Sequence, residues 1–197
     1  AASLRVDGGF GDFNIRTDSD GGSGGLGVGG GLGGAGGSAS GGSVTLDANG
    51  GILASEVELY LSASNIGGSG GDGAANGQST GGRVTLLAAD VGSNGGALLL
   101  GPVRIAADGD VAGRTELRAS NDGKIDITNL SISVAGTAAA TNGNVLTASN
   151  GILLQADNAS LEIGSELYAE TGGSIGFYAT GTGEIIANEF LSANADD

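Results

Sequence analysis

A six-residue motif that occurs twice is the feature of this sequence that most restricts its fold. Residues 41–46 are Gly-Gly-Ser-Val-Thr-Leu, and residues 81–86, 40 positions later, are Gly-Gly-Arg-Val-Thr-Leu. Each copy follows a Gly-rich stretch and precedes a second strand-like segment, and weaker echoes continue downstream at a spacing of roughly 20 residues. A repeat of this length predicts one supersecondary unit stacked on further copies of itself.

Short segments in which apolar and polar residues alternate occupy much of the remaining chain. This period of two predicts strands with one buried face. The predicted inward residues are Phe13, Ile15, Val57, Leu59, Leu61, Ala63, Ile125, Ile127, Leu130, Ile132, Val134, Ile175, Phe177 and Ala179. No segment has helical spacing, and the frequent glycines would each cost a helix about 1 kcal/mol. The sequence therefore predicts an all-β protein.

Turn signals separate the predicted strands. Asn-Gly or Asp-Gly pairs begin at Asp7, Asp20, Asn49, Asp72, Asn76, Asn94, Asp108, Asp122, Asn142 and Asn150. Such pairs supply positive φ at hairpins and also at solenoid corners, so an antiparallel sandwich is an alternative. The repeat and the total of only four Phe and three Tyr favour the solenoid, because a sandwich core uses large side chains to bridge two sheets. We predict that residues 1–197 form one right-handed parallel β-solenoid (β-helix) segment, with coils of roughly 20 residues.

Two Gly-rich inserts, 21–42 and 66–82, interrupt this pattern. The first has 14 glycines in 22 residues, broken by Leu26, Val28 and Leu32. A flexible linker would have this composition, but each insert ends where the Val-Thr-Leu repeat begins. We therefore expect loops that project from one corner and lie against the coil or a neighbouring copy. Polyglycine-II-like packing would suit them, and the three aliphatic residues are candidate contact residues.

The charge of the chain restricts its partners. Seven basic and 22 acidic residues give a formal charge of −15. The basic residues are scattered singly, so neither nucleic-acid binding nor binding to anionic lipid is expected. No apolar run approaches the roughly 20 residues of a membrane span. The absence of Cys leaves the redox compartment undecided but is compatible with export.

The residues for enzyme chemistry are few. Without His or Cys, nucleophilic triads and His-based acid–base catalysis are excluded, and the only lysine, Lys124, is predicted on an exposed strand position. Paired carboxylates leave a carbohydrate-active β-helix as an alternative, although we expect these aspartates to form turns. The acidic pairs are Asp18/Asp20, Asp108/Asp110 and Asp196/Asp197. No catalytic site is expected.

Calcium and glycans are the remaining ligands to consider. Asp18-Ser19-Asp20-Gly21 resembles the opening of an EF-hand loop, but the later ligands are missing. Residues 70–73 are only a fragment of a calcium-binding β-roll repeat. We expect no cofactor, while calcium bridging in a surface-layer or matrix protein remains an alternative. The outward tyrosines could stack on glycans or on a partner chain. These tyrosines are Tyr60, Tyr168 and Tyr178.

The repeat also carries a family resemblance. Residues 41–54 (Gly-Gly-Ser-Val-Thr-Leu-Asp-Ala-Asn-Gly-Gly-Ile-Leu-Ala), followed by 57–64 (Val-Glu-Leu-Tyr-Leu-Ser-Ala-Ser) and a Gly-rich insert, resemble repeats of filamentous-haemagglutinin-like exoproteins. These are large Gram-negative adhesins exported by two-partner secretion, with relatives among autotransporter passengers. The likeness is clearest over residues 41–136, and the secretion domain of such proteins is not recognisable.

The resemblance implies a secreted or cell-surface fibre of a Gram-negative bacterium. Its contacts would be adhesive, with a host or glycan surface, or self-associating. Neither end of the sequence has a capping pattern, which predicts a longer native chain or end-to-end assembly.

Overall fold

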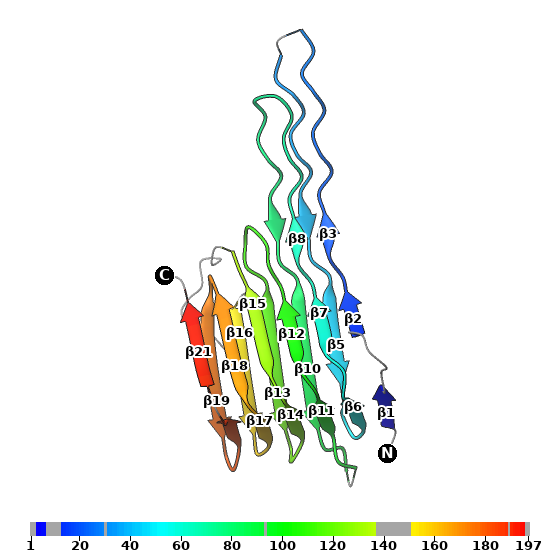
Figure 1. The fold of residues 1–197 in the computed structure, drawn as a ribbon, viewed down its shortest axis with the longest axis vertical. Helices are drawn as coiled ribbons and strands as arrows, with labels where there is room; N and C mark the ends of the chain where they lie inside the picture. The colour runs from blue at the N-terminus through cyan, green and yellow to red at the C-terminus, as the bar shows by residue number, and fades with distance from the viewer. Residues whose placement is uncertain are drawn as a thin grey trace.

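The regular secondary structure of the described chain consists of β-strands, which turns and two extended glycine-rich segments connect (Figure 1). The computed structural model describes residues 3–6, 13–29, 31–92, 94–136, 151–188 and 190–195. These ranges contain no helix, and so none that could cross a membrane. Every pairing between their named strands is parallel. The prediction of an all-β protein is confirmed, and the antiparallel sandwich is wrong for the described strands.

Most strands belong to three parallel sheets, here called sheets 1, 2 and 3. Sheet 1 contains, in spatial order, β1 (Ser3–Val6), β6 (Ile52–Ser55), β11 (Ala97–Leu100), β14 (Lys124–Ile127), β17 (Ser160–Ile163) and β20 (Glu184–Ala187). Sheet 2 contains β5 (Ser43–Asp47), β10 (Arg83–Ala89), β13 (Arg114–Ser120), β16 (Gly151–Asp157) and β19 (Ser174–Thr180). Sheet 3 contains β2 (Phe13–Arg16), β7 (Leu59–Ser62), β12 (Val103–Ala106), β15 (Leu130–Val134), β18 (Glu166–Thr171) and β21 (Phe190–Ala195). Two short pairs join β3 (Ser19–Asp20) to β8 (Asn65–Ile66) and β4 (Ala39–Ser40) to β9 (Ser79–Thr80).

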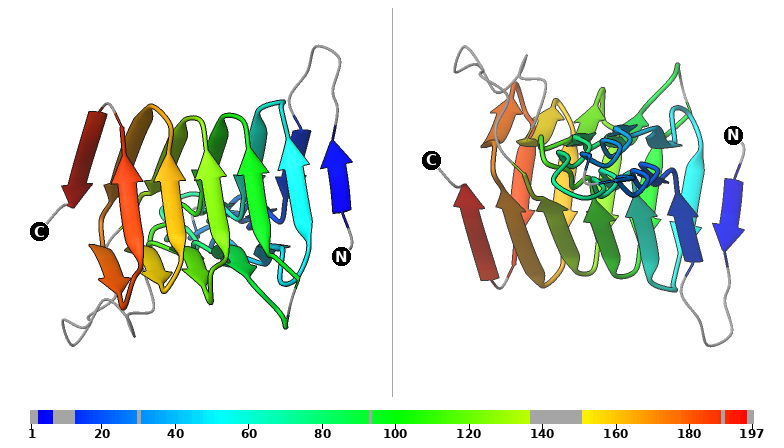
Figure 2. Two further views of the ribbon diagram at one scale, coloured as in Figure 1. Left: turned by 90° about the horizontal axis from the view of Figure 1, so that it is seen from below. Right: turned by 90° about the horizontal axis from the view of Figure 1, so that it is seen from above.

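The chain visits the three sheets in a fixed order. From β5 in sheet 2 it passes to β6 in sheet 1 and β7 in sheet 3, and β10 then lies beside β5 (Figure 2). The repeated motif explains this register, because Val44 in its first copy pairs with Val84 in its second. Where neither Gly-rich insert intervenes, the step still varies: Gly151 pairs with Ser174, 23 residues later, whereas Val103 pairs with Leu130, 27 residues later, and Val84 with Thr115, 31 residues later. The steps are therefore longer than the roughly 20 residues predicted.

One hydrophobic cluster draws side chains from all three sheets. Parallel, in-register pairing places equivalent positions in columns, such as the buried Leu86, Leu117 and Leu154 of sheet 2. The predicted inward positions are confirmed on the inner strands, and the buried ones are Leu59, Leu61, Ala63, Ile125, Ile127, Leu130, Ile132 and Val134. Phe13, Phe177 and Ala179 are exposed instead, because they lie on β2 and β19, the outermost strands of sheets 3 and 2 on their respective sides.

The turns that lead from sheet 2 to sheet 1 share a backbone conformation. Each of the five contains a residue with positive φ, a conformation that favours Gly, Asn and Asp. These residues include Gly50 (68°), Gly92 (68°), Asp122 (59°), Asn158 (47°) and Gly181 (64°). The prediction that Asn-Gly and Asp-Gly pairs form corners is thus confirmed at residues 49–50 and 122–123. Asp7, Asn142 and Asn150, which begin three further predicted pairs, lie outside the described residues.

The two Gly-rich inserts leave the body at the same end of the strands and stand away from it as one projection (Figure 1). The projection comprises residues 21–38, between β3 and β4, and 67–78, between β8 and β9. Residues 41–42 and 81–82 return to the body, so the projection is shorter than the predicted inserts. The inserts project as expected, but they do not lie against the body, because their hydrogen bonds are made mainly to one another. Contact with a neighbouring copy stays a prediction.

Candidate functional site

Backbone hydrogen bonds hold the projection together as a bundle of extended glycine-rich segments. Donors recur at intervals of three residues, as expected when segments with three residues per turn pack side by side. The donor–acceptor pairs include Gly21–Ile66, Gly24–Ser69, Gly34–Gly25, Gly37–Gly22, Gly68–Gly37, Gly71–Gly34 and Gly77–Gly68, with N–O distances of 2.7 to 2.9 Å. The packing is therefore of the polyglycine-II type, and the inserts are not free linkers.

Only some of these glycines are required by the packing. A Cβ atom on Gly24 would lie 1.8 Å from the carbonyl oxygen of Gly34, and one on Gly36 would lie 1.8 Å from that of Gly68. At Gly25, by contrast, an added Cβ would meet nothing within 4 Å. Close backbone approach therefore explains the glycines that face the inside of the bundle, while the positions that face outward can carry side chains.

Asn65 fastens the root of the projection to the body. This residue is buried, and its Nδ2 donates to the carbonyl oxygens of Thr80 (2.7 Å) and Ala63 (3.1 Å). Its Oδ1 accepts hydrogen bonds from the backbone N (2.9 Å) and Oγ (2.7 Å) of Ser19. One amide thus links the start of the first insert to the end of the second. Sequence reasoning missed Asn65, although its position directly before an insert was a usable signal.

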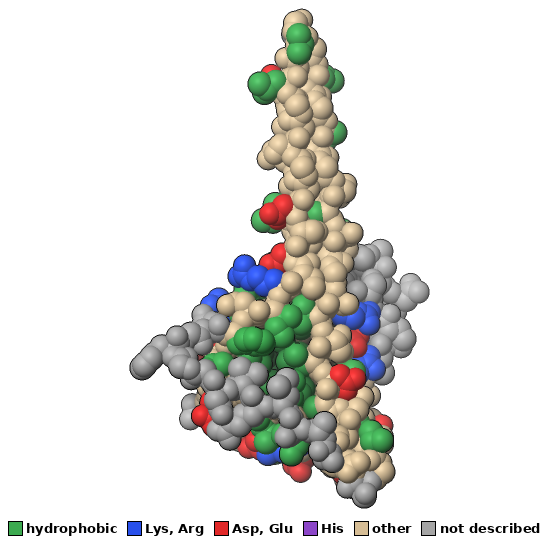
Figure 3. All heavy atoms as spheres, turned by 90° about the vertical axis from the view of Figure 1, so that its right-hand side faces the viewer, with side chains coloured by type: hydrophobic (Ala, Val, Ile, Leu, Met, Phe, Trp, Pro, Cys, Tyr) green, Lys and Arg blue, Asp and Glu red, His purple; other side chains and the backbone are tan. Residues whose placement is uncertain are grey.

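The far end of the projection carries three large aliphatic side chains, here called the apolar tip. Leu26, Val28 and Leu32 are 80%, 93% and 79% exposed. Figure 3 shows hydrophobic side chains at this end of an otherwise largely uncharged column. All three were candidate contact residues, and the structure places them near the far end of the first insert, away from the core.

Two of the three candidate tyrosines share one face of sheet 3. The register places Tyr60 beside Arg104, Arg104 beside Ser131, and Ser131 beside Tyr168. The Cζ atom of Arg104 lies 5.7 Å from the centroid of the Tyr60 ring, and that of Arg16 lies 4.7 Å from it. Tyr60 is therefore engaged by two guanidinium groups in cation–π contacts. Tyr178 lies apart from both, in sheet 2.

A hollow of about 270 Å³, here called the Tyr168 slot, lies on this face between Arg104 and Tyr168. Its polar lining also includes Glu58, Asn129, Ser131 and Glu166. The Tyr168 hydroxyl lies 2.6 Å from Oε2 of Glu170 and donates to it. This hydrogen bond, together with the negative charge of Glu170, raises the pKa of Tyr168, so the phenol stays protonated.

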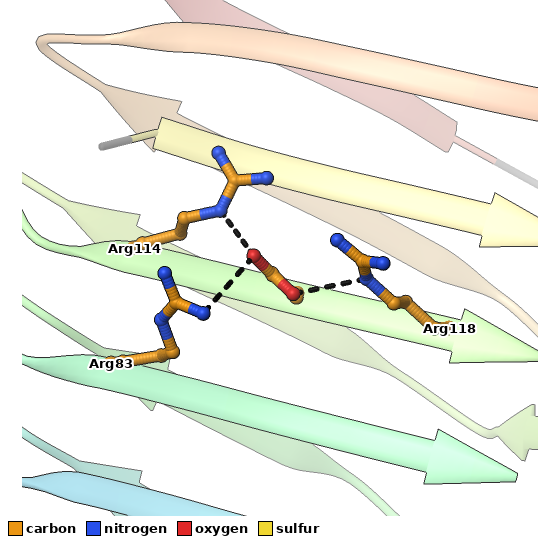
Figure 4. A network of polar contacts seen from close by, with 4 residues as sticks. Arg83, Arg114 and Arg118 are labelled. Atoms are coloured by element: carbon orange, nitrogen blue, oxygen red, sulfur yellow. Dashed lines mark hydrogen bonds and ion pairs between the residues drawn. The ribbon is translucent and has the colours of Figure 1, made fainter. Parts of the chain in front are cut away.

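Four charged side chains meet on the outer face of sheet 2 (Figure 4). The Glu116 carboxylate accepts a hydrogen bond from Nε of Arg114, and both side chains are almost completely buried. Arg118 lies 3.0 Å and Arg83 3.7 Å from the same carboxylate. These arginines are scattered singly in the sequence, but parallel pairing brings them together in the structure.

Comparisons of the chain with protein-family models, with curated proteins and with solved structures find no match. The resemblance to filamentous-haemagglutinin-like repeats stays a prediction from the repeat motif. The projection, the apolar tip and the Tyr168 slot are the features of the structure that bear on function.

The predicted acidic pairs support turns in the structure. Asp18 accepts hydrogen bonds from the Oγ of Ser62 and the backbone N of Ser64. Asp108 accepts from Ser133 Oγ and Ala135 N, each at 2.8 Å, and Asp110 accepts from Ser79 N, also at 2.8 Å. Each carboxylate thus ties its own turn to a neighbouring one. Asp196 and Asp197 lie outside the described residues.

The described part of the chain contains no group of three or more Asp and Glu residues that could hold a metal ion. The EF-hand-like start at residues 18–21 is not such a group. Its Asp18 carboxylate instead accepts hydrogen bonds from Ser62 and Ser64. Calcium bridging between separate molecules stays a prediction.

Proposed function

We propose that this chain is a structural and adhesive segment of a secreted fibre at a Gram-negative bacterial surface, similar to filamentous-haemagglutinin-like exoproteins. In this proposal the three sheets are the faces of a right-handed β-solenoid. The projection presents the apolar tip to a partner surface or to another copy of the chain. The chain acts by contact and has no catalytic role.

The open sides of the three sheets support self-association. Among the described strands, β1, β5 and β2 are outermost on one side, and β20, β19 and β21 on the other. An unpaired strand edge can accept a further strand, and in-register parallel pairing would continue the same columns of side chains. The charge of −15 opposes nonspecific association, so contacts are expected only where edges or apolar surfaces match.

The apolar tip is the observation that carries the adhesive part of the proposal. The cluster of aliphatic side chains in the body is buried, yet three large ones are exposed together at the end of the projection. Exposed apolar groups of this kind mark interaction sites. The hydrogen-bonded bundle beneath them holds them in place, which lowers the entropy cost of binding.

The test replaces the tip with serine in the variant Leu26→Ser/Val28→Ser/Leu32→Ser. Beads coated with this variant should adhere to epithelial cells less, and cluster with one another less, than beads coated with the unchanged chain. The melting temperature should be unaffected, because the tip side chains are exposed. Val91→Ser is the matched control, since Val91 is also exposed but lies on the body.

Two outcomes would contradict the proposal. Equal adherence and clustering of the tip variant would show that the tip is not the contact surface. Electron microscopy tests self-association separately: the proposal predicts filaments, and dispersed monomers at high protein concentration would contradict end-to-end assembly.

A further inference from the structure

We infer that the Tyr168 slot binds a neutral pyranose unit of an oligosaccharide. The inference does not depend on the apolar tip, because the slot lies on sheet 3 of the body. The side chains of Arg104 and Tyr168 are the two walls of the slot. The inference rests on the spacing of these walls, on the contacts of each wall, and on the chemistry of the lining.

The spacing of the walls suits one sugar ring. Arg104 and Tyr168 occupy equivalent positions on strands two apart, with Ser131 between them. Parallel strands are about 4.8 Å apart, so the backbones that carry the walls are separated by roughly 10 Å. A ring in contact with both walls needs about 7–8 Å, twice the usual carbon–carbon contact distance. The small serine leaves this space open.

Both walls already have contacts within the chain before a ligand arrives. Arg104 has the Tyr60 ring on one side and lies 3.8 Å, through Nε, from Oε1 of Glu58. Tyr168 is oriented by the hydrogen bond from its hydroxyl to Glu170. Groups that are already ordered lose less conformational entropy on binding.

The lining matches the two kinds of surface on a pyranose. Its axial C–H groups carry partial positive charge and pack favourably on the negative face of an aromatic ring such as Tyr168. Its hydroxyl groups both donate and accept hydrogen bonds. Arg104 offers donors, Glu58 and Glu166 offer acceptors, and Asn129 and Ser131 are polar as well. The two carboxylates disfavour an acidic sugar, because like charges repel.

The experiment measures sugar binding to the full chain by titration calorimetry and saturation-transfer NMR. The probes are cellotetraose, maltotetraose and chitotetraose as neutral sugars, and tetragalacturonate as the acidic one. We expect at least one neutral probe to bind, and to bind more tightly than tetragalacturonate. No binding of any neutral probe at 10 mM (about the weakest affinity such assays detect) would overturn the inference. Tighter binding of tetragalacturonate would overturn the assignment to a neutral sugar.

Variants then locate the site. Tyr168→Ala should weaken binding by about tenfold or more, the effect of losing one aromatic stacking surface, while Tyr168→Phe keeps the ring and should bind nearly as well as the unchanged chain. Tyr178→Ala is the matched control, because it removes the same side chain from sheet 2. Circular dichroism checks that each variant is folded. Equal binding by folded Tyr168→Ala and Tyr178→Ala would overturn the location.

Discussion

The side-chain amide of Asn65 donates a 2.7 Å hydrogen bond to the carbonyl oxygen of Thr80, across the root of the projection. The two residues belong to β8 and β9, which border the second insert. The other side of the same amide accepts two hydrogen bonds from Ser19, at the start of the first insert. One buried side chain therefore connects the two inserts at the root of the projection.

Asn65→Ala should loosen the projection without unfolding the body. The change removes the hydrogen bonds of the Asn65 amide to Ser19 and Thr80, which contribute about 0.5–1.5 kcal/mol each. Hydrogen–deuterium exchange should become faster in residues 21–38 and 67–78 and stay unchanged in sheets 1 to 3. Asn188→Ala, at an exposed position, should change neither region, and unchanged exchange in Asn65→Ala would argue against the fastening role.

Gly24 and Gly25 provide a matched test of the bundle. A Cβ on Gly24 would lie 1.8 Å from a backbone oxygen, whereas one on Gly25 would meet nothing within 4 Å. Gly24→Ala should therefore open the bundle and remove the exchange protection of its amides. Gly25→Ala should be neutral or slightly stabilising, by up to about 1 kcal/mol, because alanine restricts the unfolded chain. Equal protection in the two variants would mean that the bundle does not pack as described.

Much of the body could be predicted from the sequence, because its signals are local. The pairing of Val44 with Val84 follows directly from the repeated motif, and alternation identified buried residues such as Ile125 and Ile132. Alternation does not show where a sheet stops, so it failed at the outer strands, where Phe13 and Phe177 are exposed.

The candidate sites depend on contacts between residues far apart in the sequence, and these were harder to predict. Composition indicated that the inserts are glycine-rich, but it could not show that they would pack on each other and not on the body. The approach of Arg83 to Glu116 depends on the pairing of β10 with β13. The slot between Arg104 and Tyr168 likewise needs the register of three strands.

Glu170 controls the ionisation of Tyr168. Because its carboxylate accepts the hydrogen bond of the protonated phenol and repels the phenolate, the pKa of Tyr168 lies above its ordinary value of 10.0. Glu170→Gln removes the negative charge, so the pKa of Tyr168 should fall toward that value. NMR of ¹³Cζ-labelled tyrosine would follow the titration. The signals of Tyr60 and Tyr178 serve as internal controls. If the pKa of Tyr168 is the same in Glu170→Gln as in the unchanged chain, the hydrogen bond is absent in solution.

Glu116→Gln should destabilise the body. The Glu116 carboxylate lies among three guanidinium groups, and its hydrogen-bond partner Arg114 is almost completely buried. Breaking a buried ion pair by removing the charge of one partner costs about 3–5 kcal/mol. The free energy of unfolding from urea titration at pH 7 should fall by about that amount. Glu162→Gln, which weakens a more exposed pair with Lys124, should cost less than about 1 kcal/mol.

The stability difference between the unchanged chain and Glu116→Gln should depend on pH. Burial opposes ionisation of Glu116, but the hydrogen bond from Arg114 and the charges of the three arginines outweigh it, so its pKa lies below the ordinary 4.5. When folding lowers the pKa of a carboxyl group, the unfolded chain binds protons more readily than the folded chain. The contribution of Glu116 to stability is therefore complete above about pH 4.5, the pKa of the unfolded chain, and is lost as the pH falls through the folded-state pKa. The difference in stability between the unchanged chain and Glu116→Gln should therefore be constant from pH 6 to 8 (roughly two or more units above the carboxyl pKa) and shrink below pH 4.5. A difference that stays constant down to pH 3 (about one unit below the ordinary value) would show that the Glu116 carboxylate is not held by these arginines.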